Sequence, residues 1–325
     1  MSRQARIDYP GAFHHVIGRG IEHKDIFKEE ADKRSFLKRI KNQLDMSSMQ
    51  CYAWCIMDNH FHLLLQTGGT RLAEFMSRIL TGYAVYYNKV HKRSGYLFRN
   101  RYKSIVCDKD EYMLSLIRYI HLNPVKAKVI VLEELCEYLW TGYNEIIEGK
   151  GNGVIDRKEV LSYFDNNEKQ AVESYRKFIS EGKDLKENYE GGGLIRSMGG
   201  LQELEKRSKD EKDMYDERIL GGGSFVEEVF AQLDEKEKSR LSIKGVKDLV
   251  GRLARYYKVE EKQIIKSRTK CVREARQVFI YLGYEYLNKS LTELGQYIGI
   301  GQTAASKAFV LGRRLAEEKK LWEVI

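Results

Sequence analysis

The chain has 325 residues, of which 42% are hydrophobic and 32% charged, and its formal net charge is +9. The hydrophobic share, with 21 tyrosines and 12 phenylalanines, excludes a wholly disordered chain, and the length allows two or three domains. Apolar stretches are far shorter than the roughly 20 residues that cross a bilayer, so we expect no membrane helix. Without a secretory signal or a paired CxxC array, we expect a cytoplasmic protein whose five cysteines stay reduced.

The charge is distributed unevenly along the chain. Residues 1–150 hold 23 basic and 17 acidic side chains (+6), residues 151–241 hold 16 and 21 (−5), and residues 242–325 hold 17 and 9 (+8). Two basic ends around an acidic middle predict two surfaces that attract polyanions. Between Phe75 and Cys107, seven basic residues are interleaved with six aromatic residues, and the stretch contains no acidic residue. This stretch is typical of a single-stranded nucleic acid surface, although about half of its aromatic side chains are expected in the core.

Hydrophobic periodicity predicts the elements of the first 130 residues. Strands are expected at Ala12–Ile17, Cys51–Met57 and Phe61–Gln66, and helices at Asp32–Met46, Leu72–Val90 and Asp110–Leu122. The predicted order is strand, helix, strand, strand, helix, strand, helix. Strands that pair in sequence around crossover helices indicate an antiparallel sheet with helices packed on one face, a ferredoxin-like α+β fold.

The remainder of the chain divides at glycine clusters. We predict a first domain over residues 1–130, a helical appendage over 131–182, a charged glycine-rich linker over 183–224 and a last domain over 225–325.

The predicted last domain is all helical. Helices are expected at Ile243–Tyr257 and Arg273–Leu287, followed by a capping box from Ser290 to Glu293, a short helix, a glycine turn and a basic helix at Gln302–Leu315. This order indicates a DNA-binding helix-turn-helix, with a plain helical bundle as the alternative.

A histidine pair begins the third predicted strand, in Asp58-Asn59-His60-Phe61-His62. Because side chains alternate along a strand, His60 and His62 are expected on one face and Phe61 in the core. Two imidazoles about 6–7 Å apart along a strand can bind one divalent metal. Exposed or core histidines are the alternative interpretation.

A second motif closes the last predicted helix of the first domain. Tyr119 and Asn123 are four residues apart before Pro124, so the last turn would place them on one face. A phenol with a pKa near 10 is a weak nucleophile at neutral pH unless a metal and basic side chains stabilise the phenolate. An asparagine oxygen one turn away can complete the metal ligands. The alternative is a core tyrosine and a helix-capping asparagine.

These motifs resemble the REP-associated tyrosine transposases, which are single-tyrosine HUH transposases of the IS200-like superfamily. The resemblance covers roughly Tyr9–Ile130 and rests on Tyr9-Pro10-Gly11-Ala12 with His15-Val16 and Arg19-Gly20, Met57 to Leu64, Gly95 to Phe98 with Arg101 to Ser104, and Arg118 to Val125. It implies the HUH transposase fold, with Mg²⁺ or Mn²⁺ bound by His60, His62 and Asn123. It also implies that Tyr119 attacks a phosphate of single-stranded, hairpin-bearing DNA and forms a 5′-phosphotyrosine. His121 is expected to be structural, whereas His14 or His15 could face either side of the first strand.

The expected DNA contacts of the first domain are basic. They are Arg19, Lys92, Arg93, Arg99, Arg101 and Lys103.

The last domain resembles the DNA-binding domain of the replication initiator DnaA, in Lys266-Ser267-Arg268, Ala275 to Val278 and Ser290 to Gly295. It departs where that family reads bases, because the Asp-His-Thr signature is replaced by Gly301-Gln302-Thr303 and two alanines. The resemblance therefore implies the fold and duplex binding, but not recognition of the DnaA box. The expected contacts are Gln302, Thr303, Ser306 and Lys307 with bases or phosphates, and Arg268 and Lys270 with the backbone.

The sequence thus predicts a metal-dependent DNA strand transferase that acts as a monomer or homodimer at the bacterial nucleoid. One alternative is a domesticated relative that binds nucleic acid without cleaving it. Another is a metal-dependent phosphodiesterase that uses water, for which Asp58 is the only local carboxylate. The joint presence of Tyr119, His60, His62 and Asn123 favours the transferase.

Overall fold

The computed structural model describes residues 6–185, 189, 216, 218–266, 270–287, 289–319 and 321. The chain divides into two compact units, residues 1–230 and residues 231–325. Among the described residues, no helix is long and apolar enough to cross a membrane.

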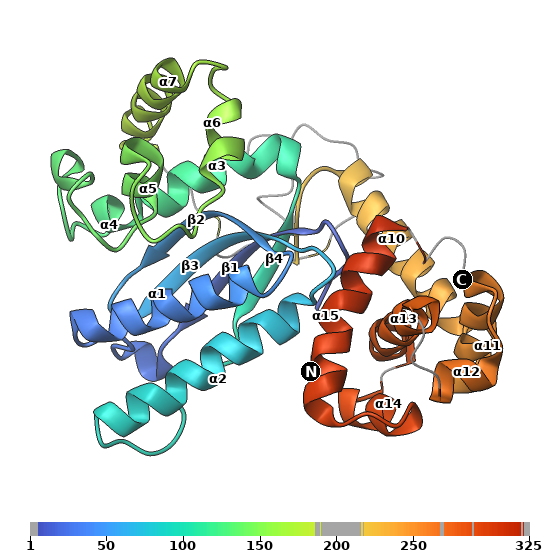
Figure 1. The fold of residues 1–325 in the computed structure, drawn as a ribbon. Coiled ribbons are helices and arrows are strands. Elements are labelled where there is room, and N and C mark those ends of the chain that lie inside the picture. Colours follow the sequence, from blue (N-terminus) through green and yellow to red (C-terminus); the bar gives the residue numbers. More distant parts are fainter. Residues whose placement is uncertain are drawn as a thin grey trace. The chain divides into compact units, whose positions relative to one another are not determined.

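A five-stranded sheet lies at the centre of the first unit (Figure 1). Its strands are β1 (Phe13–Arg19), β2 (Gln50–Ile56), β3 (His60–Gln66), β4 (Lys103–Cys107) and β5 (Ile219–Leu220), in the spatial order β2-β3-β1-β4-β5. All neighbours are antiparallel except β4 and β5, which are parallel. β1 and β3 pair without a register shift from Phe13, opposite Gln66, to Arg19, opposite His60.

Helices surround this sheet. They are α1 (Glu30–Asp45), α2 (Leu72–Val90), α3 (Lys109–His121), α4 (Asn123–Lys126), α5 (Tyr143–Glu148), α6 (Arg157–Ser162), α7 (Glu168–Ser180) and the start of α10 (Gly223–Ser242), with 3-10 turns η1 (Ile21–His23) and η2 (Leu132–Glu134). The strands and helices predicted for the first 130 residues are confirmed to within two residues at each end.

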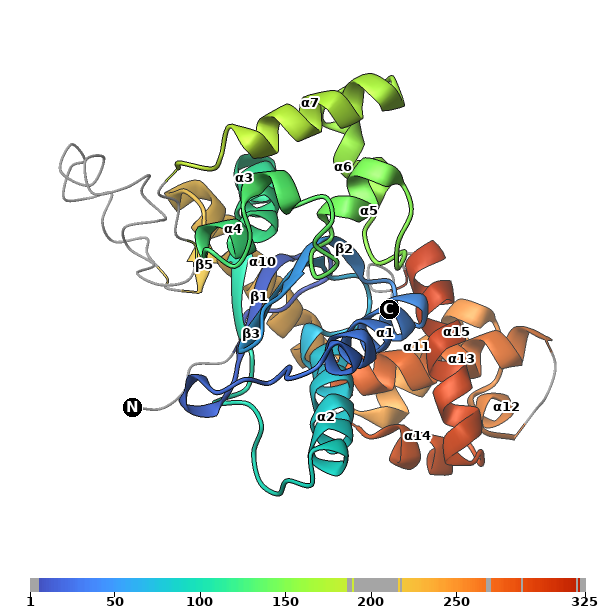
Figure 2. The same ribbon diagram turned by 90° about the vertical axis from the view of Figure 1, so that its left-hand side faces the viewer.

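Both faces of the sheet are covered, so the prediction of helices on one face is wrong (Figure 2). α1 and α2 pack against the face that carries Leu63 and Leu65. α3, α5, α6 and α7 share a core with the opposite face, which carries Leu64. All three leucines are fully buried. A strand that is apolar on both faces needs cover on both, as in other doubly covered sheets.

The predicted linker over residues 183–224 lies largely outside the described residues. Its end does not behave as a linker, because Ile219 and Leu220 are buried and form β5. Hydrogen bonds from Val106 N to Arg218 O and from Asp108 N to Leu220 O, both 2.8 Å, attach this segment to β4.

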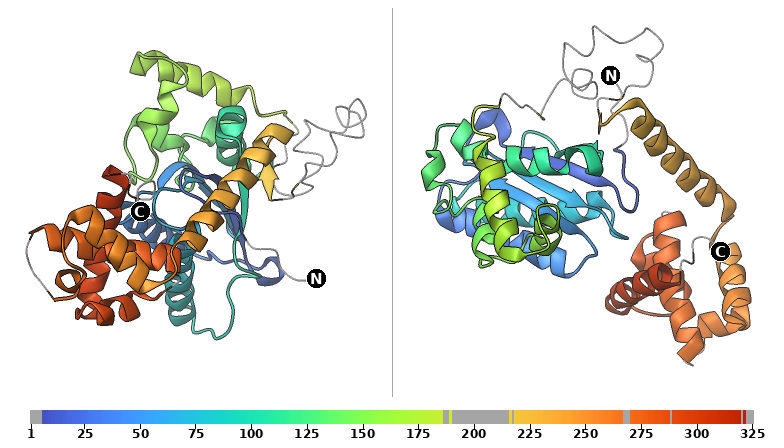
Figure 3. Two further views of the ribbon diagram at one scale, coloured as in Figure 1. Left: turned by 90° about the vertical axis from the view of Figure 1, so that its right-hand side faces the viewer. Right: turned by 90° about the horizontal axis from the view of Figure 1, so that it is seen from above.

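The second unit is a group of helices (Figure 3, orange to red). It contains α11 (Val246–Tyr257), α12 (Glu261–Lys266), α13 (Lys270–Leu287), α14 (Leu291–Tyr297) and α15 (Gln302–Glu318). α13 contacts each of the other four helices. The predicted capping box is confirmed, since Ser290 N donates to the Glu293 carboxylate at 2.9 Å and Glu293 N donates to Ser290 Oγ at 3.2 Å. α12 was not predicted.

Candidate functional site

The pairing of β1 with β3 brings three histidines to one face of the sheet. His60 and His62 share a face as predicted, with ring centroids 5.1 Å apart, and Phe61 is buried on the other side. The register places Arg19 opposite His60 and Ile17 opposite His62. His15 points to the same face, and its Nε2 lies 3.0 Å from His62 Nδ1.

α3 places Tyr119 against these histidines. The Tyr119 ring is 5.9 Å from that of His62 and 6.0 Å from that of His15, and it stands almost perpendicular to both. Lys126 Nζ lies 5.4 Å from the Tyr119 ring centroid, and the Tyr189 ring centroid lies 5.3 Å from it. A cation and three aromatic rings therefore enclose the phenol ring.

Asn123 lies near the histidines, but in a different helix from the one predicted. α3 ends at His121, so Asn123 does not lie in its last turn but begins α4. Pro124 lies in the first turn of α4. Proline is tolerated there because backbone N–H groups in the first turn have no partner within the helix. The Asn123 Nδ2 atom lies 3.4 Å from His62 Nε2, which joins the two predicted motifs at one point.

The site is largely closed to solvent. His62 is fully buried, and only 6% of Tyr119 and 9% of Asn123 are exposed. His60 is half-buried at the edge. Electrostatic interactions are stronger in such an environment than in water.

The side chains present fit a divalent metal. His60 Nδ1 lies 2.6 Å from Asn59 Oδ1 and His62 Nδ1 is hydrogen-bonded to His15, an arrangement that directs the Nε2 atom of each ring toward a ligand role. Imidazole nitrogens are common ligands of divalent first-row ions, and amide oxygens also suit Mg²⁺ and Mn²⁺. Within the described ranges no three His, Cys, Asp or Glu side chains are grouped to hold a metal. Beside the two imidazoles stands the amide of Asn123, whose Nδ2 faces His62 and whose oxygen could face it if the amide group turned over.

Two other histidines of these motifs are structural. His121 is fully buried, and its Nδ1 lies 2.6 Å from the Tyr175 hydroxyl, as expected of a structural residue. His14 is fully buried on the strand face opposite His15. Burial lowers the pKa of each of these two imidazoles to about 3, so both are neutral at physiological pH.

The carboxylate required by a water-using phosphodiesterase is engaged elsewhere. Asp58 forms an ion pair with Lys33 of α1 at 2.7 Å. α1 packs on the face of the sheet opposite His62, so the ion-pair partner of Asp58 belongs to the other side of the sheet.

The predicted DNA contacts of the first unit form two groups. Arg19 and Lys103 belong to the site face, since Arg19 is opposite His60 and Lys103 is opposite Ile17. The other four, Lys92, Arg93, Arg99 and Arg101, lie in the loop over residues 91–102 between α2 and β4, and all but Arg93 are exposed.

Within that loop, Arg93 makes contacts with two tyrosines. It donates to Tyr96 O at 3.3 Å and its guanidinium lies 5.7 Å from the Tyr87 ring centroid. Tyr96 is 86% exposed, whereas Tyr83, Tyr87 and Tyr102 are buried. The aromatic set is thus divided between core and surface, as expected.

In the second unit, Gln302, Thr303, Ser306 and Lys307 are all exposed on the first half of α15. Ser306 Oγ donates to Gln302 O at 3.0 Å. Arg268 lies outside the described residues, and so does the side chain of Lys270.

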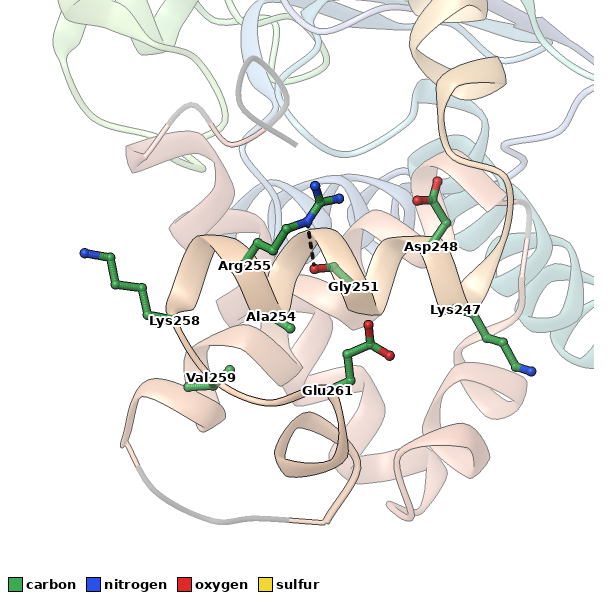
Figure 4. Close-up of a pocket in the computed structure, with 8 residues that line it drawn as sticks. All are labelled: Lys247, Asp248, Gly251, Ala254, Arg255, Lys258, Val259 and Glu261. Carbon is green, nitrogen blue, oxygen red and sulfur yellow. Dashed lines mark hydrogen bonds between the residues drawn. The ribbon is translucent and has the colours of Figure 1, made fainter.

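A groove on the second unit was not predicted (Figure 4). Its lining residues come from α11, the connection that follows it and the start of α12, and are Lys247, Asp248, Gly251, Ala254, Arg255, Lys258, Val259 and Glu261. The helical period that sets Lys247, Gly251 and Arg255 on one face of α11 could have revealed it. Three cations and two carboxylates line the groove, so its charge is mixed, and none of the predicted α15 contacts belongs to it.

Comparison with known proteins identifies two parts of the chain. Residues 11–123 match the family described as "Transposase IS200 like", and residues 246–309 match "Bacterial dnaA protein helix-turn-helix". No curated protein matches the chain. One similar solved structure is a REP-associated tyrosine transposase bound to a REP hairpin, with 12% identity over 46% of this chain and 86% of that chain and a TM-score of 0.39.

Proposed function

We propose that this chain, which carries a transposase domain of the IS200-like family and a DnaA-type helix-turn-helix domain, nicks and rejoins single-stranded DNA through Tyr119. The observation that carries the proposal is that Tyr119 and Asn123 both lie next to His62. Its ring lies 5.9 Å from that of Tyr119, and its Nε2 lies 3.4 Å from the Asn123 amide. A phenol, two imidazoles and an amide thus meet in one enclosed site of a transposase domain.

The proposed reaction is the one that the resemblance to single-tyrosine transposases implies. Tyr119 Oη attacks a backbone phosphorus, the bond from phosphorus to the 3′-oxygen breaks, and that oxygen takes up a proton while the phenol loses one. The products are a 5′-phosphotyrosine and a free 3′-OH. Because the tyrosyl ester keeps the phosphodiester bond energy, a 3′-OH can reverse the step on a second DNA end without ATP.

His60, His62 and Asn123 would hold Mg²⁺ or Mn²⁺, which supplies Lewis-acid polarisation of the scissile phosphate when bound. The Lys126 ammonium, 5.4 Å from the Tyr119 ring, contributes positive charge that favours the phenolate. His62, which is fully buried, would help to keep bulk water from the attacked phosphate, which would favour transfer to tyrosine over hydrolysis.

The exposed residues supply the contacts for a hairpin substrate. Arg99 and Arg101 would bind phosphates and Tyr96 would stack on a base of the single strand. Thr303 and Lys307 of α15 would contact a neighbouring duplex, consistent with exposed positions at the start of a recognition helix. We expect the protein to act on the nucleoid in the cytoplasm.

The test is a cleavage assay on the full chain. Labelled hairpin oligonucleotides with Mn²⁺ should yield a covalent protein–DNA band that Tyr119→Phe abolishes. Tyr112→Phe is the matched control, since Tyr112 lies two turns earlier on α3 and should leave the band unchanged. A band of equal intensity from Tyr119→Phe would exclude this nucleophile.

A second candidate is a regulator that binds DNA without cutting it. The small exposed fraction of Tyr119, 6%, favours this reading because a phosphate must reach the phenol. Hairpin binding by a folded, Mn²⁺-loaded wild type that gives no covalent band would establish the regulator.

A further inference from the structure

We propose that His15 is a positioning residue that fixes the tautomer and the ring orientation of His62. The proposal rests on the metal site proposed for His60, His62 and Asn123, and it assigns a task to a histidine that does not itself touch the substrate.

The geometry of the pair is set by the sheet. β1 and β3 pair in register, with His15 opposite Leu64 and His62 opposite Ile17, so the two histidines are diagonal neighbours on one face. His15 Nε2 lies 3.0 Å from His62 Nδ1, and the two ring planes differ by only 24°. Both residues are fully buried, so backbone pairing on two central strands holds the contact in place.

The hydrogen bond between His15 and His62 restricts which ring nitrogens can carry a proton. Two neutral imidazoles can share it only if one nitrogen donates and the other accepts, and an unpaired buried charge would be costly. His62 Nε2 faces Asn123 at 3.4 Å and must keep its lone pair to bind a metal. His62 therefore carries its proton on Nδ1 and donates it to His15 Nε2, which requires His15 to be protonated on Nδ1.

Loss of His15 would affect the site in two ways. His62 would have a buried Nδ1–H without this acceptor, which favours the Nε2–H tautomer that cannot bind a metal through Nε2. Its ring would also lose the lateral support that sets its near-perpendicular contact with Tyr119, at 5.9 Å and 87°.

The chain supplies a matched control one residue away. His14 is equally buried on the same strand, but it points to the opposite face. His14→Leu and His15→Leu therefore remove the same ring from the same strand, and a general effect on folding would be common to both. His15→Gln restores an acceptor near the position of Nε2.

The first measurement is the His62 tautomer in the metal-free full chain, by ¹⁵N NMR of histidine-labelled protein. We expect a protonated Nδ1 in wild type and in His14→Leu, and loss of that state in His15→Leu. An Nε2–H tautomer in wild type would overturn the proposal whether or not the protein binds metal.

The second measurement is Mn²⁺ affinity by titration calorimetry. We expect His15→Leu to bind Mn²⁺ roughly 10–100-fold more weakly than His14→Leu, with recovery in His15→Gln. Equal affinities of the two leucine variants would overturn the role of His15. A wild type that binds no Mn²⁺ would instead contradict the metal site of the proposed function, and the tautomer result would still decide the His15 assignment.

Discussion

At the scale of single residues, the pleat of β1 separates two adjacent histidines into different environments. His15 meets His62 at 3.0 Å, whereas His14 is buried on the opposite face, where the burial lowers its pKa to about 3. Sequence patterns could not assign them, because both faces of β1 are buried and its residues show no polar alternation. Only the register with β3 decides which histidine belongs to the site.

His14 should make stability depend on pH. The unfolded chain takes up a proton at His14 near pH 6.5, but the folded protein does so only near pH 3. The contribution of neutral His14 to the free energy of unfolding is therefore fully present above pH 6.5 and is lost as the pH falls toward 3. We expect wild type to lose on the order of 2 kcal/mol more than His14→Leu between pH 7 and pH 5. Urea unfolding of the full chain at both pH values measures this, and equal losses would contradict the neutral, buried state of His14.

At the scale of elements, periodicity located the helices and strands of the first 130 residues but not their packing. α2 matches its predicted range, because its apolar residues follow one helical stripe. The helices that cover the face carrying Leu64 could not be assigned to it from the sequence. Both faces of the sheet are apolar, so only tertiary contacts decide which helix packs on which face. β5 is only two residues long and pairs with β4 after a long excursion of the chain, so no local pattern marks it.

For the candidate site, the motifs likewise predicted the main residues but not all of their contacts. Tyr119, His60, His62 and Asn123 were identified by their motifs, and the structure brings them together. The contacts of His15 and Lys126 were not assigned, because they depend on strand pairing and on the turn from α3 into α4.

α7 supports the helix that carries Tyr119. The Tyr175 hydroxyl of α7 meets His121 Nδ1 at 2.6 Å, and the Arg118 guanidinium lies 4.6 Å from the Phe178 ring centroid. Tyr175→Phe leaves the buried His121 Nδ1 without this partner, which should cost about 1–3 kcal/mol of unfolding free energy. Urea unfolding at pH 7 measures the loss, and Tyr163→Phe, at a tyrosine that is 45% exposed, should change little. Equal effects of the two variants would contradict the support role.

At the scale of the whole molecule, the net charge of +9 includes exposed basic residues in both units, for which we propose separate tasks. In the first unit, exposed basic residues lie in the loop over residues 91–102 and at the edge of the histidine face. In the second unit, Lys307 stands among small polar residues at the start of α15. Such a division predicts that each task can be removed alone.

His60→Ala should abolish hairpin cleavage but leave duplex binding unchanged. The alanine removes one proposed metal ligand at the half-buried edge of the sheet, far along the chain from the second unit. His23→Ala, at an exposed histidine, is the control for cleavage. Cleavage gels and duplex-binding titrations on the same preparations check this, and loss of both activities in His60→Ala would argue against two independent sites.

Lys307→Ala should have the reverse effect. If Lys307 contacts a phosphate, duplex affinity falls for all sequences and the slope of log K against log salt decreases by about 1, while hairpin cleavage persists. Fluorescence anisotropy at several salt concentrations measures the slope. Lys258→Ala removes another exposed lysine, from the groove beside α11, so a matching loss there would show that α15 is not the duplex-binding surface.

The most direct test of the central claim is to locate the covalent bond. After reaction of the full chain with hairpin DNA and Mn²⁺, nuclease and protease digestion followed by mass spectrometry should find a 5′-phosphonucleotide on the peptide that contains Tyr119, attached at that residue. An adduct on any other residue, or cleaved DNA without an adduct, would contradict the account.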